Sequence, residues 1–450
     1  MTPREFRATG SLAAVFALRL LGLFMIYPVF AAYARRLPDA TPAMIGLALG
    51  GYGLTQGLLQ IPFGLLSDRI GRKTVITLGL LLFAAGSAVA ALATSLDGIL
   101  LGRILQGAGA VGSATLALVA DLTREEVRTR AMAMVGMTIG LGFVIAIVVG
   151  PVLAGAIGVP GIFWLTAVLA AVAIAIVQLA VPAPPALQRH RDAEPVPALF
   201  GRVLRQGELL RLDFGIFALH AVLTASFLAV PRLLAGTLQL GGGGTWRLYL
   251  PVLAASVVLM VPAIIVAEKR GRMKEVFIAA ILLLAASLAA LLLGGGLAAV
   301  VVAALIGFFT AFNVMEAMLP SLITKAAPAG AKGTATGIYS SAQFLGIFVG
   351  GAGGGWALGS GGVTGVLAFA LALALLWLAL AATMRRPQRY RSYLARCGDI
   401  ARADAPALAA KLSAAPGVVE AVVAADEGVA YLKIDPRQFD AAAVSRICGG

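Results

Sequence analysis

The sequence predicts an all-α membrane protein: twelve transmembrane helices arranged as two parallel six-helix halves, followed by a small α+β domain. Of its 450 residues, 60% are hydrophobic and 12% are charged, with a mean hydropathy of +0.95. Soluble globular chains carry about 25% charged residues. Apolar runs recur along the chain, and each is long enough to cross a ~30 Å hydrocarbon core as a helix. The runs are uniformly apolar rather than alternating, which excludes a transmembrane β-barrel.

The apolar runs divide the chain into four parts. The first run follows Arg4 and Arg7, and it is longer than the roughly 7–15 apolar residues of a signal peptide, so we interpret it as a membrane span. The predicted spans cover 11–33, 44–66, 74–95, 98–121, 131–155, 160–181, 212–235, 247–267, 276–294, 297–324, 334–357 and 362–384. The predicted domains are therefore a half at 1–181, a polar linker at 182–211, a second half at 212–387 and a tail domain at 388–450.

The net charge of +14 is spread between the apolar runs, which argues against a nucleic-acid partner. With the N-terminus inside, seventeen Lys and Arg residues lie in the loops on the inner side, and only Arg35, Arg36, Arg232 and Arg247 lie on the outer side. Because cytoplasmic loops carry the excess of Lys and Arg, both termini and the linker are predicted to be cytoplasmic. The basic loops also suit contacts with anionic lipid headgroups.

The two halves repeat. Ser67-Asp68-Arg69-Ile70-Gly71-Arg72 reappears 200 residues later as Ala267-Glu268-Lys269-Arg270-Gly271-Arg272. Both copies are predicted on the same side of the membrane, so the repeat is parallel. Transporters of the major facilitator type have two such halves, with a substrate site between them near the midplane.

The loop after the second span carries the most specific motif. Residues 64–73 read GLLSDRIGRK, which resembles the signature loop of the major facilitator superfamily. Glycine at 71 permits a turn with positive φ, and glycine at 64 permits close helix approach. The resemblance implies a cluster that locks the outward-facing state, with Asp68 at a helix N-terminus and Arg72 paired with Asp121. Its expected members are Gly64, Asp68, Arg69, Gly71, Arg72 and Asp121. The alternative is a tight basic loop that only fixes topology.

Two further motifs resemble those of the same superfamily. Arg103 and Gln106 share a helix face in a Leu-x-x-Arg-x-x-Gln-Gly pattern of the fourth span. The resemblance links this arginine to proton transfer, and the alternative is an arginine that snorkels to the interface. Gly150, Pro151 and Gly155 resemble the Gly-Pro-x-x-Gly-Gly motif of antiporters, with alanine at 154 in place of one glycine.

Ionisable groups inside predicted spans are functional candidates, because each costs about 2.5–3.5 kcal/mol at the membrane centre on insertion scales. They are Arg19, His220 and Glu316, with Asn313 on the same helix face as Glu316. The alternatives are a neutral hydrogen-bonded histidine and a structural ion pair between Arg19 and Glu316. Asp213 and Glu268 lie at span edges, where we expect them to be solvated.

The tail predicts a strand at 390–396, a helix at 405–414, strands at 417–424 and 429–434, and a helix at 439–447. This order is most of a ferredoxin-like module. Its sixth element is missing before Gly450, so we expect an open edge strand or a truncated module. Cys397 and Cys448 are too few and too isolated for a disulfide framework or a metal site, and a cytosolic tail would keep both reduced. We therefore predict no metal and no cofactor.

The tail resembles that of the YajR group of proton-coupled drug-efflux transporters. Residues 16–22, 214–221 and 316–322 also resemble spans one, seven and ten of that group. No nucleotide-binding or metalloprotease motif is present, so energy from ATP on this chain and enzyme activity are not expected. The resemblance implies a monomer in the bacterial inner membrane that exchanges protons for small amphipathic compounds.

The predicted cavity combines a few polar side chains with many apolar ones, which suits hydrophobic cargo. Its polar members are Arg19, Gln56, Gln60, His220, Asn313, Glu316 and Gln343. Among the ionisable groups, Glu316 is the expected proton carrier. Two rival functions stay open: a facilitator or importer of a polar metabolite, and a membrane sensor in which the tail domain binds a ligand.

Overall fold

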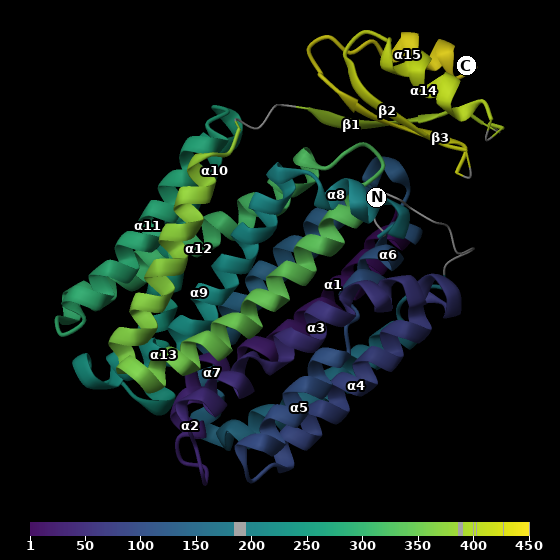
Figure 1. Cartoon of the computed structure of the whole chain (residues 1–450). Helices are drawn as coiled ribbons and strands as arrows, with labels where there is room; N and C mark the ends of the chain where they lie inside the picture. Colours follow the sequence, from purple (N-terminus) through teal and green to yellow (C-terminus); the bar gives the residue numbers. More distant parts are fainter. Residues whose placement is uncertain (184–194, 386–389, 399, 402, 426, 450) are drawn as a thin grey trace.

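The computed structural model describes residues 1–183, 195–385, 390–398, 400–401, 403–425 and 427–449. Part of the predicted linker and Asp426 in the predicted hairpin lie outside this range. Long helices form a bundle, and a small sheet with two short helices lies beyond the end of the bundle where α1 begins (Figure 1). We call this end the terminal face and the other end the opposite face.

The bundle helices follow the predicted apolar runs. In the first half they are α1 (Pro3–Phe24), α2 (Tyr27–Ala34), α3 (Pro42–Ile70), α4 (Arg72–Leu92), α5 (Leu96–Ala108), α6 (Gly112–Asp121) and α7 (Glu125–Leu179). After the linker come η1 (Pro197–Leu199), α8 (Phe200–Leu204), α9 (Gly207–Thr237), η2 (Gly242–Gly244), α10 (Trp246–Lys269), α11 (Met273–Gly294), α12 (Ala298–Ala326) and α13 (Lys332–Ala382).

In the described part of the chain, nine helical segments are long and apolar enough to cross a membrane. Two of them, in α7 and α13, break at glycines with left-handed backbone, Gly158 (φ 71°) and Gly362 (φ 61°). Gly158 falls between two predicted spans, and Gly362 is the first residue of the last predicted span. The 29-residue helix α3 covers the second predicted span but is not among the nine. The membrane character of the bundle is therefore established, and the count of twelve spans stays a prediction.

The sequence repeat has a structural counterpart at the terminal face. Gly71 between α3 and α4 has φ 98°, and Gly271 between α10 and α11 has φ 68°. A lysine two or three residues after each glycine caps a helix of its own half. Lys73 Nζ donates to the carbonyl of Val181 (3.0 Å), and Lys274 Nζ donates to that of Met384 (2.5 Å). A lysine at a helix C-terminus satisfies free carbonyls and complements the helix dipole.

Helix α13 packs between α3 and α9 through glycines. A Cβ on Gly53 of α3 would lie 2.3 Å from the carbonyl oxygen of Phe344, and one on Gly46 would lie 2.2 Å from that of Gly351. On the other side of α13, a Cβ on Gly350 would lie 2.2 Å from the carbonyl oxygen of Ala221. Small residues allow such close helix approach in membranes. The α3–α13 contacts join the two halves from the opposite face to the middle of the bundle, and we call them the glycine seam.

The tail folds as predicted. Its elements are β1 (Arg391–Arg396), α14 (Ala405–Ser413), β2 (Val418–Ala424), β3 (Val429–Ile434) and α15 (Ala441–Ile447). The three strands form an antiparallel sheet in the order β1-β3-β2. One sheet face packs on the two helices, through Leu432, Ile434 and Val444 among others. This arrangement fits a ferredoxin-like domain.

The expectation that the two cysteines are isolated and reduced is wrong in this structure. Cys397 follows β1 and Cys448 follows α15, and the fold brings them together as a disulfide across 51 residues. Spacing along the chain did not show this, because the two residues meet only after both elements pack on the same core.

The free face of the tail sheet lies against the bundle (Figure 1). Lys433 Nζ donates to the carbonyls of Ala326 (3.3 Å) and Ala327 (3.2 Å), which end α12. The Glu420 carboxylate accepts from the backbone N–H of Ala329 (3.1 Å) and pairs with Arg202 of α8. The tail therefore contacts both the α12–α13 loop and the linker helix.

Candidate transport site

The polar residues predicted to line one cavity form two clusters, one in each half. In the first half, the Arg19 guanidinium of α1 donates to the Tyr52 hydroxyl (2.6 Å) and to Gln56 Oε1. Gln56 Nε2 in turn donates to Gln60 Oε1 (2.6 Å). Arg19 is 4% exposed and Phe83 lies 5.7 Å from it, so its charge is held inside the first half by α3 and α4.

The second cluster joins α9, α12 and α13. His220 Nε2 lies 3.3 Å from Glu316 Oε1 and 2.9 Å from Gln343 Nε2. His220 Nδ1 lies 3.2 Å from the carbonyl oxygen of Ile216, so this nitrogen is the donor whenever the ring is neutral. The histidine side chain is 1% exposed, whereas that of Glu316 is 30% exposed. Glu316 is thus more exposed than its histidine partner.

The suggested pair between Arg19 and Glu316 is not present in the structure. The contacts of Arg19 are with the first half, and those of Glu316 are with His220 and Gln343. Asn313 does not join this cluster: its amide donates to Ser256 Oγ of α10 (2.9 Å). The basic side chain beside Glu316 is therefore the imidazole of His220 and not a guanidinium.

The signature loop forms a buried charge cluster. Arg72 is 2% exposed and donates to Asp121 Oδ2 (3.2 Å), Ser67 Oγ (2.7 Å) and Asp68 Oδ1. The expected pairing of Arg72 with Asp121 is thus present. A Cβ on Gly64 would lie 3.1 Å from Ser113 Cβ, so α3 and α6 approach closely at that point. Arg69 is exposed.

The start of α13 contacts the linker. The backbone N–H of Val196, in the linker, donates to Thr334 Oγ1 in the first turn of α13 (2.9 Å). Pro195 lies between the two halves here, 3.9 Å from a Cβ on Gly64 and 3.1 Å from a Cβ on Gly337. Linker residues therefore separate α3 from α13 at the terminal face, while the glycine seam joins them toward the opposite face.

Arg103 does not snorkel. It is fully buried, donates to Gln106 Oε1 (2.9 Å) and to the carbonyl of Leu49 (3.3 Å), and lies 5.1 Å from the Tyr52 ring. Gln106 donates to Ser87 Oγ (2.7 Å). The Tyr52 side chain thus contacts two buried arginines of the first half, Arg19 and Arg103.

The antiporter-like motif lies near the opposite face. A Cβ on Gly150 would lie 2.1 Å from the carbonyl oxygen of Met25, at the break between α1 and α2. A Cβ on Gly155 would lie 3.3 Å from the Cα of Gly243 in η2, which belongs to the second half. Pro151 lies between them in α7, which continues through it. The motif therefore places close backbone contacts at the end where the halves meet.

Sequence reasoning missed several side chains. Tyr52 and Ser87 are bonded to predicted site residues, but an isolated tyrosine or serine in a membrane helix gives no clear signal. Asp213 was expected to be solvated at a span edge, and this is wrong because it is 6% exposed. Its position at the start of α9 indicated an edge, and only the packing of α9 shows that it is buried.

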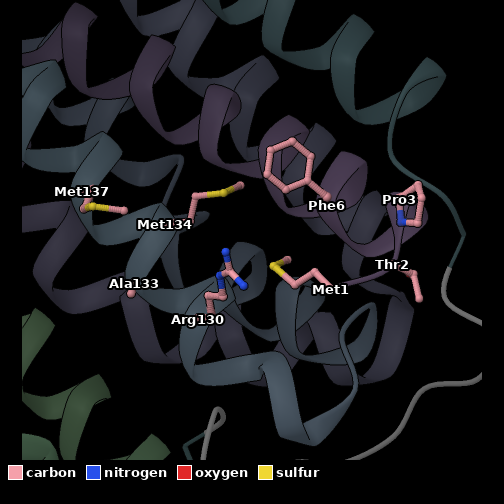
Figure 2. Close-up of a pocket in the computed structure, with 8 residues that line it drawn as sticks. All are labelled: Met1, Thr2, Pro3, Phe6, Arg130, Ala133, Met134 and Met137. Carbon is pink, nitrogen blue, oxygen red and sulfur yellow. The ribbon is translucent and has the colours of Figure 1, made fainter.

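A groove of about 490 Å³ opens at the terminal face between the start of α1 and α7 (Figure 2). Its lining is mainly apolar, with one arginine: Met1, Thr2, Pro3, Phe6, Arg130, Ala133, Met134 and Met137. It contains none of the predicted cavity residues. Among the described residues, no group of three or more His, Cys, Asp or Glu side chains is placed to hold a metal ion.

Known proteins match this chain over most of its length. Residues 12–351 match the model of the Major Facilitator Superfamily. The inner membrane transport protein YajR of Escherichia coli (strain K12) is 44% identical over 438 residues, which cover 97% of this chain and 96% of that protein.

Two solved structures share the fold at low identity. A bacterial homologue of the human lysosomal transporter Spinster, in an inward-facing and occupied conformation, has a TM-score of 0.66 and 16% identity, covering 85% of this chain and 96% of its own. The human organic anion transporter MFSD10 has a TM-score of 0.62 and 20% identity, and the match covers 84% of this chain and 100% of that chain. The chain therefore belongs to the Major Facilitator Superfamily, as a multi-pass membrane transporter and not an enzyme.

Proposed function

We propose that this protein exports small amphipathic compounds in exchange for protons, and that Glu316 carries the proton. The observation that supports this is the contact of Glu316 with His220, 3.3 Å apart in the middle of the second half. An intramembrane carboxylate with a titratable partner is the type of group that proton-coupled transporters use. In this proposal the Gln343 amide, 2.9 Å from the imidazole, completes the site.

The His220 ring allows two bonding patterns that differ by one proton. In the neutral ring, Nδ1 donates to the Ile216 carbonyl and Nε2 accepts from the Gln343 amide. In the protonated ring, Nε2 donates to the Glu316 carboxylate instead. A proton that leaves Glu316 for His220 thus exchanges one hydrogen bond for another and leaves no buried group without a partner.

The chemistry of the cavity favours amphipathic cargo. Arg19, Gln56 and Gln60 bond among themselves and with Tyr52, and Asn313 bonds with Ser256. A polar metabolite would need several free donors and acceptors at the site. A cationic amphipathic compound would need only apolar surface and the Glu316 carboxylate, for which it would compete with the proton.

The topology that fits this function has twelve spans, with the nine apolar segments divided at Gly158 and Gly362 and with α3 added. The terminal face, where the basic loops gather, is then cytoplasmic in a bacterial inner membrane. We also propose that the protein acts as a monomer. The groove in Figure 2 would lie at the lipid headgroup level, and its apolar lining with Arg130 suits an acyl chain and an anionic headgroup.

The cluster at Arg72 serves as the conformational lock in this proposal. The glycine seam closes the opposite face, and Pro195 separates α3 from α13 at the terminal face. This arrangement suits a state that is closed to the periplasm. In the alternate state, α13 would approach α3 at the terminal face, and its N-terminal dipole would attract Asp68.

The test is a comparison of Glu316→Gln with Glu268→Gln in inverted membrane vesicles. Glu268 is an exposed carboxylate of the same half and a matched control. Ethidium is the probe, and its uptake is measured with and without a pH gradient. Glu316→Gln should abolish gradient-driven uptake, a loss of at least tenfold, and Glu268→Gln should keep it.

Protein level and melting temperature must be measured together with the flux, because loss of a purely structural pair between Glu316 and His220 would also lower uptake. A Glu316→Gln protein that is folded, binds ethidium and still shows full gradient-driven uptake would remove Glu316 from the mechanism. The search would then move to Asp121 and His220. Uptake by the wild-type protein that ignores the pH gradient would instead favour a facilitator.

A further inference from the structure

Asp213 is a carboxylate buried inside the bundle. It is 6% exposed, and in the described part of the chain neither of its oxygens has a hydrogen-bond partner. Burying a carboxylate without a partner is costly, so it needs an explanation. The Glu316–His220 site described above does not include it.

Tyr339 of α13 is a second buried group without a partner. It is 6% exposed, and its hydroxyl makes no hydrogen bond within the described residues. Tyr339 lies one turn before Gln343, which contacts both His220 and Glu316, so its phenol is on the face of α13 that carries the proposed proton site.

The helix register places these groups on a line toward the terminal face. Asp213 precedes His220 by seven residues on α9, which is two turns or about 10 Å on the same face. Tyr339 precedes Gln343 by one turn on α13. The contacts of Gly346 with Phe217 and of Gly350 with Ala221 hold the two helices in parallel register. Asp213 and Tyr339 thus both lie on the terminal-face side of the proposed proton site.

The cations of neighbouring elements have other partners. Arg211 donates to Glu208 Oε1 (2.8 Å) and to Thr383 Oγ1 (3.1 Å). Arg202 of α8 pairs with Glu420, and Lys325 of α12 pairs with Glu268 (3.5 Å). Asp68 of α3 and Arg72 of α4 bind each other. Among the described residues, the titratable groups on the neighbouring turns of α9, α12 and α13 include His220, Glu316 and Tyr339, and Lys332 begins α13.

We propose that Asp213 is a second proton-carrying residue, which receives the proton that Glu316 releases and passes it to water at the terminal face. This rests on the proposed function of Glu316. The O–H bond of the Glu316 carboxylic acid breaks, and its proton goes to the Tyr339 oxygen, directly or through a water. The tyrosine gives its own proton to the Asp213 carboxylate and ends unchanged. Asp213, now neutral, then loses its proton to solvent, so one proton crosses for each transfer.

The test uses purified full-length protein in proteoliposomes with ethidium as the probe. Asp213→Asn should reduce pH-gradient-driven transport at least tenfold, yet keep ethidium exchange without a gradient, because exchange needs alternating access but no net proton release. Tyr339→Phe should reduce gradient-driven transport less, since a water can replace the hydroxyl. Asp213→Glu should restore coupling, and Glu268→Gln should behave as the wild type.

Infrared difference spectroscopy provides a readout that needs no substrate. A protonated-carboxyl band that titrates with pH should disappear in Asp213→Asn, shift in Asp213→Glu and persist in Glu316→Gln. If Asp213→Asn does not fold, a shift of the band in Asp213→Glu decides whether the band belongs to residue 213. Absence of such a band, or full gradient-driven transport in folded Asp213→Asn, overturns the inference. If wild-type ethidium flux does not depend on the pH gradient but the Asp213 band is still present, the proposed proton coupling is wrong. The assignment of the protonated carboxyl to Asp213 would then stand.

Discussion

Arg72 shows how one buried guanidinium organises the terminal face. It binds a hydroxyl and two carboxylates from α3 and α6, and it is almost fully buried. Removing one partner of a buried pair leaves a charge without compensation, at a cost of about 3–5 kcal/mol. Asp121, 1% exposed, should therefore tolerate replacement less well than Asp68, whose side chain is 16% exposed.

Asp68→Asn is the substitution that tests the lock with the least damage to the fold. The amide keeps the size of the carboxylate, but it gains less from a helix dipole and from Arg72. We expect the outward-facing state to lose population several-fold, measured by the reaction rate of a cysteine introduced near Gly53 with a reagent added from the periplasm. The matched control is Asp97→Asn, at the start of α5. Equal rates and equal transport in both variants would mean that Asp68 is not part of a lock.

Residues of the site were predictable where chemistry alone marks them. Arg19, His220 and Glu316 stand out because any ionisable group in an apolar span is rare. Their partners were not predictable, because helix register decides that Glu316 meets His220 and that Arg19 meets Tyr52. Asp213 was misread for the same reason: its distance from the span centre is visible in the sequence, but the packing of α13 against it is not.

At the scale of elements, the glycine seam carries a sharp prediction. Gly53→Ala adds one methyl group 2.3 Å from the carbonyl oxygen of Phe344, so α3 and α13 must separate. Overpacking of this kind costs about 1–3 kcal/mol. The melting temperature of the purified protein should fall by several degrees, and the periplasmic side should become more accessible.

Gly140→Ala is the control for the seam, because a Cβ at Gly140 meets nothing within 4 Å. It should leave the melting temperature unchanged or raise it slightly, since alanine is the better helix former. A similar fall in melting temperature in both variants would show that membrane helices of this protein tolerate alanine poorly in general, and that the effect is not a property of the seam.

The sequence predicted elements better than contacts between elements. The strands and helices of the tail begin and end within about two residues of their predicted bounds, because alternation and turn residues are local signals. The left-handed Gly71 was predictable from its motif. The docking of the tail on the α12–α13 loop was not, since Lys433 and Glu420 look like ordinary surface charges until the sheet is placed against the bundle.

At the scale of the whole molecule, the tail contacts define a testable coupling. The pKa of Lys433 is lowered mainly by burial, and Glu420 partly offsets this. The double variant Glu420→Ala and Lys433→Ala removes the bonds to Ala329, Ala326 and Ala327 and leaves the tail core intact. We expect the tail to become accessible to protease at least tenfold faster, while ethidium transport persists.

The control for this variant is Lys411→Ala, on the outward side of α14. It should leave the protease sensitivity unchanged. Complete loss of ethidium transport in the double variant, with a folded bundle, would mean that the tail is required for the cycle. A tail that senses a ligand would then become the better explanation.

The glycine seam also has an evolutionary consequence. Glycine is the smallest residue, so every mutation at the seam adds atoms, and no neighbouring position can compensate when the added atom meets backbone. Seam positions should therefore stay fixed while cavity side chains, which can shrink as well as grow, are free to drift. A transporter built in this way can change its cargo over generations without altering the surface on which its two halves close.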